Sequence, residues 1–369
     1  MKIYRIVFFV FLLMMFHSMS GKSSVASIPQ IEQDTLPPTH RKIIPLPIYF
    51  RTPETGSAFG GGAIMTFRFE GQTEATPRSQ IQAAFIYTVQ KQILTYMPFE
   101  LYLKNDTYRL FGEIGYFKYV YPYFGIGANI SEDDVENYSV NFPRVEINFL
   151  RRIRPNFFAG IQYFSDNFDI IERDPFGELI KDEVLGTEGG LTSGLGVVGV
   201  YDTRDNNFFP RKGYYLEAYF QNYNKVIGSD YEFSNTRIDA RKYVDLGKGK
   251  VLALNFYGKF SFGKTPFYAL SEMGGSRRMR GYTKGQYRDE HFATIQTEFR
   301  FPVIWRFGGV LFGGLGSVGG SGDGFEKIFP SIGAGMRFKV LKEDNINLRV
   351  DYAIGKVGSK FYITFGEAF

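Results

Sequence analysis

Cysteine is absent from the 369-residue sequence, and histidine and tryptophan are scarce, with three copies and one copy. Without cysteine the chain has no disulfide framework, thiol nucleophile, Cys-ligated zinc site or lipoprotein anchor. Charge of one sign is also lacking, since 43 Lys and Arg stand against 38 Asp and Glu and no basic block is present. We therefore expect no nucleic-acid partner.

Aromatic residues and glycine are abundant instead. The chain has 39 Phe, 25 Tyr and 42 Gly, and aromatics make up 18% of it. Disordered chains are poor in aromatics, and glycine weakens helix interiors by about 1 kcal/mol each. The composition therefore favours a folded protein with little helix.

The first residues resemble an export signal. Lys2 and Arg5 precede an apolar run over 6–16, and small and polar residues follow at 18–21. This arrangement is typical of a secretory signal peptide, and the run is too short to span a membrane. We predict a signal peptide over 1–21 and a disordered periplasmic leader over 22–43, which is polar and contains prolines.

Apolar and polar residues alternate with period two through the rest of the chain. The clearest examples are 252–262, 293–303, 332–340 and 346–354. Strands of about 9–11 residues suit a tilted crossing of a bilayer. An exported chain of such strands predicts an all-β fold, a transmembrane antiparallel β-barrel over 44–369. The alternative is a secreted β-sandwich or propeller.

Counting back from the C-terminus gives about sixteen strands. They are 359–369, 345–356, 330–341, 306–318, 292–304, 250–262, 231–245, 212–224, 191–203, 156–168, 139–153, 106–118, 92–104, 78–90, 57–70 and 44–52. If the last strand ends in the periplasm, the long connections 119–138, 169–190, 263–291 and 319–329 lie outside. The short turns near Asn105, Pro155, Gly247 and Trp305 then lie in the periplasm, the usual asymmetry of such barrels.

Motifs of enzymes are missing. Two G-x-G-x-x-G stretches, 194–199 and 314–319, lie within alternating strands, whereas a nucleotide site needs a helix directly after the glycines. His291 is the only histidine of the barrel region, and no serine stands beside it in the sequence. We expect no catalytic, cofactor-binding or metal-binding residues, and no enzyme.

A turn over 202–213 has its own polar signature. Asp202 and Asp205 can accept hydrogen bonds from nearby backbone N–H groups, and Pro210 and Gly213 mark the end of the turn. We interpret Arg204 as a local ion-pair partner, and strand parity places the turn in the periplasm. The alternative is a docking site for a periplasmic partner.

Three motifs resemble a known family. They are RMRGY at 278–282 followed by TEFRFP at 297–302, YDTRDN at 201–206 followed by FFPRKG at 208–213, and a last strand ending in Phe369. Together they resemble the outer-membrane assembly-factor superfamily that contains BamA and TamA, also called the bacterial surface antigen family. The resemblance covers residues 44–369. It implies a sixteen-stranded barrel whose R-G-Y loop folds inward and sets its arginine against acidic residues of the lumen wall.

In this sequence the loop arginine is Arg280, and the alternation places Glu298 inward as its partner. Gly281 would let the backbone turn tightly behind Arg280, and Tyr282 would pack on the lumen wall. The family's second acid falls at Gly314, which leaves one acid for Arg280. The alternative is an external basic loop that faces lipopolysaccharide phosphates.

The last strand also resembles a family signal. Phe361, Ile363, Phe365 and Phe369 alternate, and we expect them to face outward as the signal read by the barrel-assembly machinery. Glu367 interrupts the series, and we expect it near the periplasmic rim, where charge costs little.

The family's periplasmic POTRA domains do not fit between the predicted cleavage site and residue 44, so we expect a barrel-only member. We expect it in the outer membrane of a Gram-negative bacterium, in contact with lipids and lipopolysaccharide and possessing a seam between strands 44–52 and 359–369. Pro45 and Pro47 favour such an edge. The predicted role is insertion or assembly of outer-membrane proteins or lipids; the alternative is a passive channel or scaffold in an outer-membrane complex.

Overall fold

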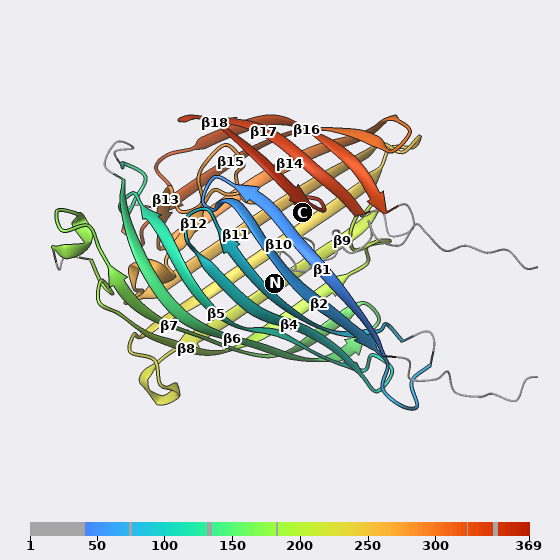
Figure 1. Cartoon of the computed structure of the whole chain (residues 1–369), viewed down its shortest axis with the longest axis horizontal. Coiled ribbons are helices and arrows are strands. Elements are labelled where there is room, and N and C mark those ends of the chain that lie inside the picture. Colours follow the sequence, from blue (N-terminus) through green and yellow to red (C-terminus); the bar gives the residue numbers. More distant parts are fainter. Residues whose placement is uncertain (1–40, 74–75, 131–134, 182–183, 323, 342–345) are drawn as a thin grey trace, which may run out of the picture.

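The computed structural model describes residues 41–369 except 74–75, 131–134, 182–183, 323 and 342–345. The predicted signal peptide and nearly all of the predicted leader lie outside these residues. Within them, sixteen antiparallel strands close into one barrel (Figure 1). The predicted fold class, its antiparallel order and its number of strands are confirmed.

The barrel strands follow one another around the wall in chain order. They are β1 (Lys42–Thr52), β2 (Gly56–Phe67), β3 (Ser79–Thr88), β4 (Ile93–Leu103), β5 (Tyr108–Tyr123), β6 (Glu136–Arg154), β7 (Phe157–Glu172), β8 (Gly189–Asp202), β9 (Gly213–Tyr223), β10 (Phe233–Asp245), β11 (Val251–Gly263), β14 (His291–Ile304), β15 (Phe307–Gly319), β16 (Phe329–Leu341), β17 (Ile346–Gly355) and β18 (Gly358–Phe365). Between β11 and β14, the short strands β12 (Ser271–Met273) and β13 (Tyr287–Asp289) form a separate hairpin.

Three short 3-10 helices lie in the connections: η2 (Glu178–Ile180), η3 (Lys225–Ile227) and η4 (Phe267–Ala269). Among the residues that the structure describes, no helix has the length and apolarity needed to cross a membrane.

The period-two pattern sorts side chains between the two faces of the wall. In β14, Gln296 and Glu298 are buried and face the lumen. Ile295 of the same strand, which pairs with β11 on one side and β15 on the other, is 63% exposed on the outer face. Leu311 and Ile332 are similarly exposed on the outer face. An outer face of large apolar side chains is what a barrel presents to the hydrocarbon of a bilayer.

Several strands differ from the predicted bounds, and the largest differences lie in two regions. β5, β6 and β7 extend several residues further at one end, where Tyr119, Tyr121 and Tyr123 continue the alternation. β18 ends earlier than predicted, at Phe365, because Gly366 has a φ of 73° and turns the chain out of the strand.

The connections differ in length between the two ends of the barrel. At one end lie the long segments 123–136, 172–189, 263–291 and 319–329, and at the other lie the short turns 103–108, 154–157, 245–251 and 304–307. This matches the predicted asymmetry. We call the second end, which also holds the turn 202–213 and the C-terminus, the periplasmic end, as the prediction assigns it.

The lumen is filled in two different ways. Beside β1–β7 it holds an apolar cluster in which Phe117, Phe142, Phe168 and Tyr268 stack in sequence, with ring centroids 4.3–4.9 Å apart. Beside β11–β18 it holds the 263–291 segment, whose hairpin contacts β14 and β15. We call residues 263–291 the inward loop.

Candidate functional site

The inward loop reaches the lumen wall through small residues on β15. Met279 and Tyr282 are fully buried. A Cβ atom at Gly316 would lie 2.9 Å from Met279 Cγ, and one at Gly314 would lie 3.4 Å from its sulfur. The glycines of this G-x-G-x-x-G stretch therefore leave the space that the loop occupies.

The tip of the inward loop is fixed by three hydrogen bonds, each between a tyrosine hydroxyl and a backbone group. The Gly281 N–H donates to the Tyr362 hydroxyl of β18 at 3.0 Å. The Tyr282 hydroxyl donates to the Pro330 carbonyl at 2.6 Å and accepts from the Lys356 N–H at 2.9 Å. Gly281 has a φ of 103°, and a Cβ there would lie 2.8 Å from the Gly355 nitrogen, so only glycine fits without strain.

Arg280 is placed against two carboxylates. Its Nη2 donates to Glu298 Oε1 at 2.5 Å, and its Nη1 donates to Asp351 Oδ2 at 2.6 Å. All three side chains are at most 1% exposed. The guanidinium also stacks on the Phe312 ring, 3.4 Å from its centroid. The expectation of a single acid is wrong, because β17 supplies the second acid that position 314 lacks.

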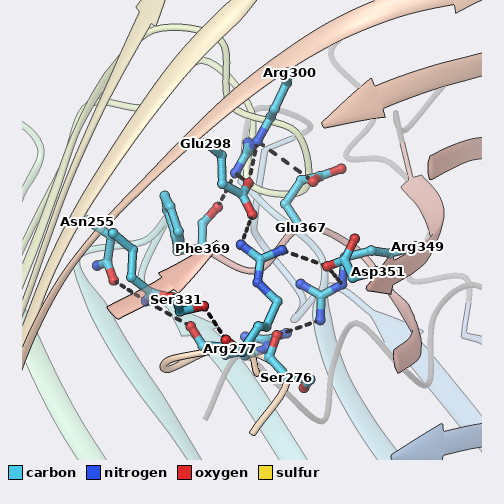
Figure 2. Close-up of polar contacts among 12 residues, drawn as sticks. Asn255, Ser276, Arg277, Glu298, Arg300, Ser331, Arg349, Asp351, Glu367 and Phe369 are labelled. Atoms are coloured by element: carbon cyan, nitrogen blue, oxygen red, sulfur yellow. Dashed lines mark hydrogen bonds and ion pairs between the residues drawn. The ribbon is translucent and has the colours of Figure 1, made fainter. Parts of the chain in front are cut away.

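Further buried charges surround this triad (Figure 2). Arg300 Nε donates to Glu298 at 2.8 Å, and Arg337 bonds Asp351 at 2.5 Å and Glu367 at 2.8 Å. We call the set the charge cluster: Arg280, Glu298, Arg300, Arg337, Arg349, Asp351 and Glu367. Breaking one side of a buried pair typically costs about 3–5 kcal/mol. The cluster therefore holds the loop, β14, β16, β17 and the C-terminal tail in one arrangement.

The C-terminal tail differs from its predicted position at Phe369. Phe361 faces outward and is 48% exposed, but Phe369 is only 6% exposed and packs in the lumen with Tyr243 and Ala253. A backbone oxygen of Phe369 accepts from Arg300 Nη2 at 2.9 Å. Phe369 therefore does not continue the outward series, because the turn at Gly366 sends residues 366–369 inward.

Ile363 fits the predicted outward series, whereas Phe365 and Glu367 do not. Ile363 is partly exposed, whereas Phe365 is buried. Glu367 is 3% exposed and accepts from Asn347 at 2.8 Å as well as from Arg337, so it is a buried member of the charge cluster and not a rim residue.

The turn 202–213 has the local contacts that its sequence suggests. Arg204 forms a two-pronged ion pair with Asp202, at 2.8 and 2.6 Å, and Asp205 Oδ1 accepts from the N–H groups of Arg211 and Lys212. At Gly213, φ is 107° and a Cβ would lie 2.3 Å from the Thr203 oxygen. Pro210, which precedes Arg211 in the sequence, is buried. The sequence prediction did not include Asn206, whose Oδ1 accepts from the N–H groups of Phe208 and Phe209, both at 2.8 Å.

A second ion-pair group ties the hairpin of the inward loop. Glu272 of β12 lies 3.4 Å from Arg288 of β13 and 3.7 Å from Lys284. Burial alone would raise the pKa of Glu272, but Lys284, Arg288 and Lys259 outweigh it and hold that pKa below its usual value. The Arg288 side chain is 1% exposed and its Nη2 reaches the Pro122 carbonyl. This pairing holds the hairpin against the end of β5.

One serine does approach the barrel histidine. Ser321 Oγ lies 3.4 Å from His291 Nε2, but this hydroxyl also donates to Glu290. His291 Nδ1 has no hydrogen-bond partner among the described residues. A triad needs a carboxylate on that nitrogen to orient the imidazole, so this contact lacks the geometry of one. Among the same residues, no group of His, Asp and Glu is arranged to hold a metal ion.

The joint between β1 and β18 is the weak point of the wall. The two strands share one register pair, Arg51 opposite Ile363. By contrast, β1 pairs with β2 from Lys42–Thr66 through Thr52–Gly56. We call the β1–β18 joint the seam. It coincides with the predicted position.

Residues 56–369 match the Omp85 superfamily domain. Among solved structures, the chain is similar to BamA from Haemophilus ducreyi lacking POTRA domains 1–3, with 14% identity, a TM-score of 0.61, and coverage of 89% of this chain and 70% of that one. It is also similar to CdiB from Acinetobacter baumannii, with 12% identity, a TM-score of 0.56, and coverage of 89% and 60%. CdiB from Escherichia coli is similar as well, with 9% identity, a TM-score of 0.57, and coverage of 90% of this chain and 64% of that one.

The chain thus spans about three fifths to seven tenths of the length of these proteins. A comparison with curated proteins gives no match. The structural similarity shows the fold, and the match over 56–369 covers most of the sequence and all but the first strand of the barrel. This chain belongs to the Omp85 superfamily.

Proposed function

We propose that this barrel takes part in inserting proteins or lipids into the outer membrane of a Gram-negative bacterium, through opening of the seam. The observation that carries the proposal is the single register pair between Arg51 and Ile363, beside strands that pair along their lengths elsewhere. An edge with few hydrogen bonds needs little energy to open. Its free N–H and C=O groups can then template a new strand.

Both edges of the seam are poor partners for each other. Pro45 and Pro47 of β1 have no N–H to donate. On the other side, β18 has only eight residues, and the chain leaves the wall at Gly366. The prolines of β1 and the short length of β18 therefore support a seam with few hydrogen bonds.

The inward loop contacts both sides of the seam. Its Lys284 N–H donates to Glu54, in the β1–β2 turn, at 2.7 Å, and its Gly281 N–H donates to Tyr362 of β18 at 3.0 Å. Movement of β1 away from β18 must therefore strain or break one of these bonds. We propose that the loop couples the seam to the charge cluster, which acts as its fixed end.

Locking the seam tests this proposal. The pair Arg51→Cys with Ile363→Cys would form a disulfide across the seam in a chain without other cysteines. Phe59→Cys with Tyr87→Cys is the matched control, because these residues face each other on β2 and β3 and both are exposed on the outer face. Purified variants would be reconstituted in liposomes, and the folding rate of an unfolded eight-stranded barrel and the flipping rate of a fluorescent phospholipid would be measured.

We expect the oxidised seam variant to lose acceleration of one of these processes and to regain it on reduction, while the control variant is unaffected by oxidation. Equal activity of the oxidised and reduced seam variants would contradict the proposal. Steady ion conductance through both oxidised variants would instead favour the passive channel. The inward loop and the charge cluster, which occupy the lumen, make that outcome unexpected.

A further inference from the structure

A cavity of about 290 Å³ lies in the lumen towards the periplasmic end. Arg277 and Arg278 of the inward loop line it, together with Arg237 and Arg241 of β10 and the C-terminal Phe369. Its opposite wall is apolar and includes Phe111, Leu150, Phe158 and Val200 from β5–β8. We call this space the lower cavity. Four carboxylates, those of Glu100, Asp202, Glu217 and Asp239, also line it, so the cavity has a charged part of both signs and an apolar part.

Three of the six arginines that line the lower cavity have carboxylate partners. Arg241 grips Asp239 with two hydrogen bonds, one of 2.8 Å. Arg237 lies 3.8 Å from Glu217, and Arg109 lies 2.6 Å from Asp106. Of the four carboxylates in the lining, Asp239 and Glu217 belong to these pairs, Asp202 pairs with Arg204, and Glu100 accepts a hydrogen bond from Gln80.

Arg277 and Arg278 are different. Neither guanidinium forms an ion pair with any acidic residue among the described parts of the chain. Arg278 stacks on Tyr257, 3.5 Å from the ring centroid, which fixes its plane without neutralising its charge. Burial, followed by the charges of Arg349, Arg241 and Arg278, holds the pKa of Arg277 well below its usual value. Two neighbouring cations thus lie half-buried in a positive environment.

The backbone that carries this pair is held in place. The Arg277 carbonyl accepts from Gln296 Nε2 at 3.0 Å, and the Arg278 carbonyl accepts from the Gly274 N–H at 2.8 Å. Holding two unpaired cations together is costly unless an anion joins them. The held backbone and the stacking of Arg278 on Tyr257 also preorganise part of the site, since that ordering is complete before a ligand arrives.

We propose that the lower cavity is a binding site for a phosphate group, held between Arg277 and Arg278. Guanidinium forks match phosphate oxygens in pairs, and a phosphate monoester of nearly two negative charges balances both arginines, whereas a single carboxylate balances one. The apolar wall formed by Phe111, Leu150 and Phe158 lies across the same space, where it can cover a short hydrocarbon segment attached to the phosphate. Free phosphate and the monoester headgroup of a phosphatidic acid share this chemistry.

The test uses the whole folded barrel in detergent. Isothermal titration calorimetry would measure binding of inorganic phosphate, of glycerol 3-phosphate and of lysophosphatidic acid, a lysophospholipid whose headgroup is a phosphate monoester. The variants are Arg277→Gln, Arg278→Gln and the double variant. Arg151→Gln is the control, because Arg151 is an exposed arginine at the same end that does not line the lower cavity. Heat-modifiable migration on a gel would confirm that each variant is folded.

We expect phosphate-bearing ligands to bind the wild type and the Arg151→Gln control alike. Each cavity substitution should weaken binding roughly tenfold or more, the effect of losing a charge-assisted hydrogen bond. Tighter binding of the lysophospholipid than of inorganic phosphate would identify a lipid headgroup site, and equal binding would identify a free phosphate site. Absence of binding by all three ligands, or equal binding by the cavity variants and the wild type, would overturn the proposal.

The unfolding temperature gives a second, independent measurement. In phosphate-free buffer, Arg277→Gln should leave it unchanged or raise it, because the substitution removes repulsion between like charges. Adding phosphate should raise the unfolding temperature of the wild type by mass action and leave that of the double variant unmoved. A parallel rise in both proteins would also overturn the proposal. Neither result depends on whether the seam opens.

Discussion

Arg280 in the inward loop donates to Glu298 in β14 across 2.5 Å, and both side chains are almost completely shielded from solvent. The bond joins the tip of a long loop to the lumen wall. Arg280 Nη1 donates to Asp351 of β17, so this one guanidinium joins the loop to both β14 and β17.

Replacing Arg280 should therefore destabilise the barrel. In Arg280→Glu, Glu298 and Asp351 each lose one of their arginine partners and face a third buried carboxylate, and we expect a loss on the scale of about 3–5 kcal/mol. Adding Glu298→Arg should recover only part of it, because Asp351 still faces the introduced glutamate. The measurement is the unfolding temperature in detergent, with Arg151→Glu as an exposed control. An unchanged temperature for Arg280→Glu would show that the loop does not depend on this contact.

Gly281→Ala tests the backbone of the same loop. The new Cβ would lie 2.8 Å from the Gly355 nitrogen at a φ of 103°, so we expect the loop tip to be displaced. Gly71→Ala is the matched control, since Gly71 also has positive φ, 78°, but has open space around it. In both variants, an alanine at positive φ costs of order 1–3 kcal/mol of stability. Only Gly281→Ala adds the further cost of the steric clash. Limited proteolysis of the loop would check this. Equal cleavage of both variants would contradict the packing described here.

Phe369 and Phe361 should have separable roles. Phe369→Ala removes a lumen side chain that packs on Tyr243, and we expect it to lower the stability of the folded barrel by about 3 kcal/mol. Phe361→Ala removes an outward side chain and should spare that stability while reducing the amount inserted, if the outward series is an assembly signal. Unfolding temperature and outer-membrane yield would be measured for each variant. The account of the tail fails if Phe369→Ala unfolds at the wild-type temperature.

The hairpin of the inward loop should weaken in acid. The folded-state pKa of Glu272 is held below its usual value of 4.5, so its stabilising contribution is complete above that pH and is lost as pH falls through the folded pKa. Between about pH 5 and pH 2, the unfolding temperature of Glu272→Gln should fall less than that of the wild type. Glu188→Gln, which removes an exposed carboxylate, is the control. Parallel curves for Glu272→Gln and the wild type would refute this role.

The sequence predicted the strands well because a barrel wall separates lipid from lumen at every residue. The same alternation placed Glu298 inward. It could not reveal that Asp351 meets the same arginine, since that depends on the register of β14 to β17 around the wall. Nor could it distinguish Gly366, which bends the chain, from the many glycines that lie flat in strands, so Phe369 was placed on the wrong face. The sequence placed the loop of Arg277 and Arg278 in the lumen but could not show which groups these two arginines face there.

The central claim is that the seam opens, and hydrogen–deuterium exchange on the unmodified barrel in lipid nanodiscs tests it most directly. Amides of β1 and β18 that face the seam have few partners, so we predict that peptides covering 42–52 and 358–365 exchange far faster than those covering 233–245 and 251–263, whose strands β10 and β11 pair in register throughout. Slow exchange in β18, equal to that in β10 and β11, would mean that the seam stays shut and would contradict the account.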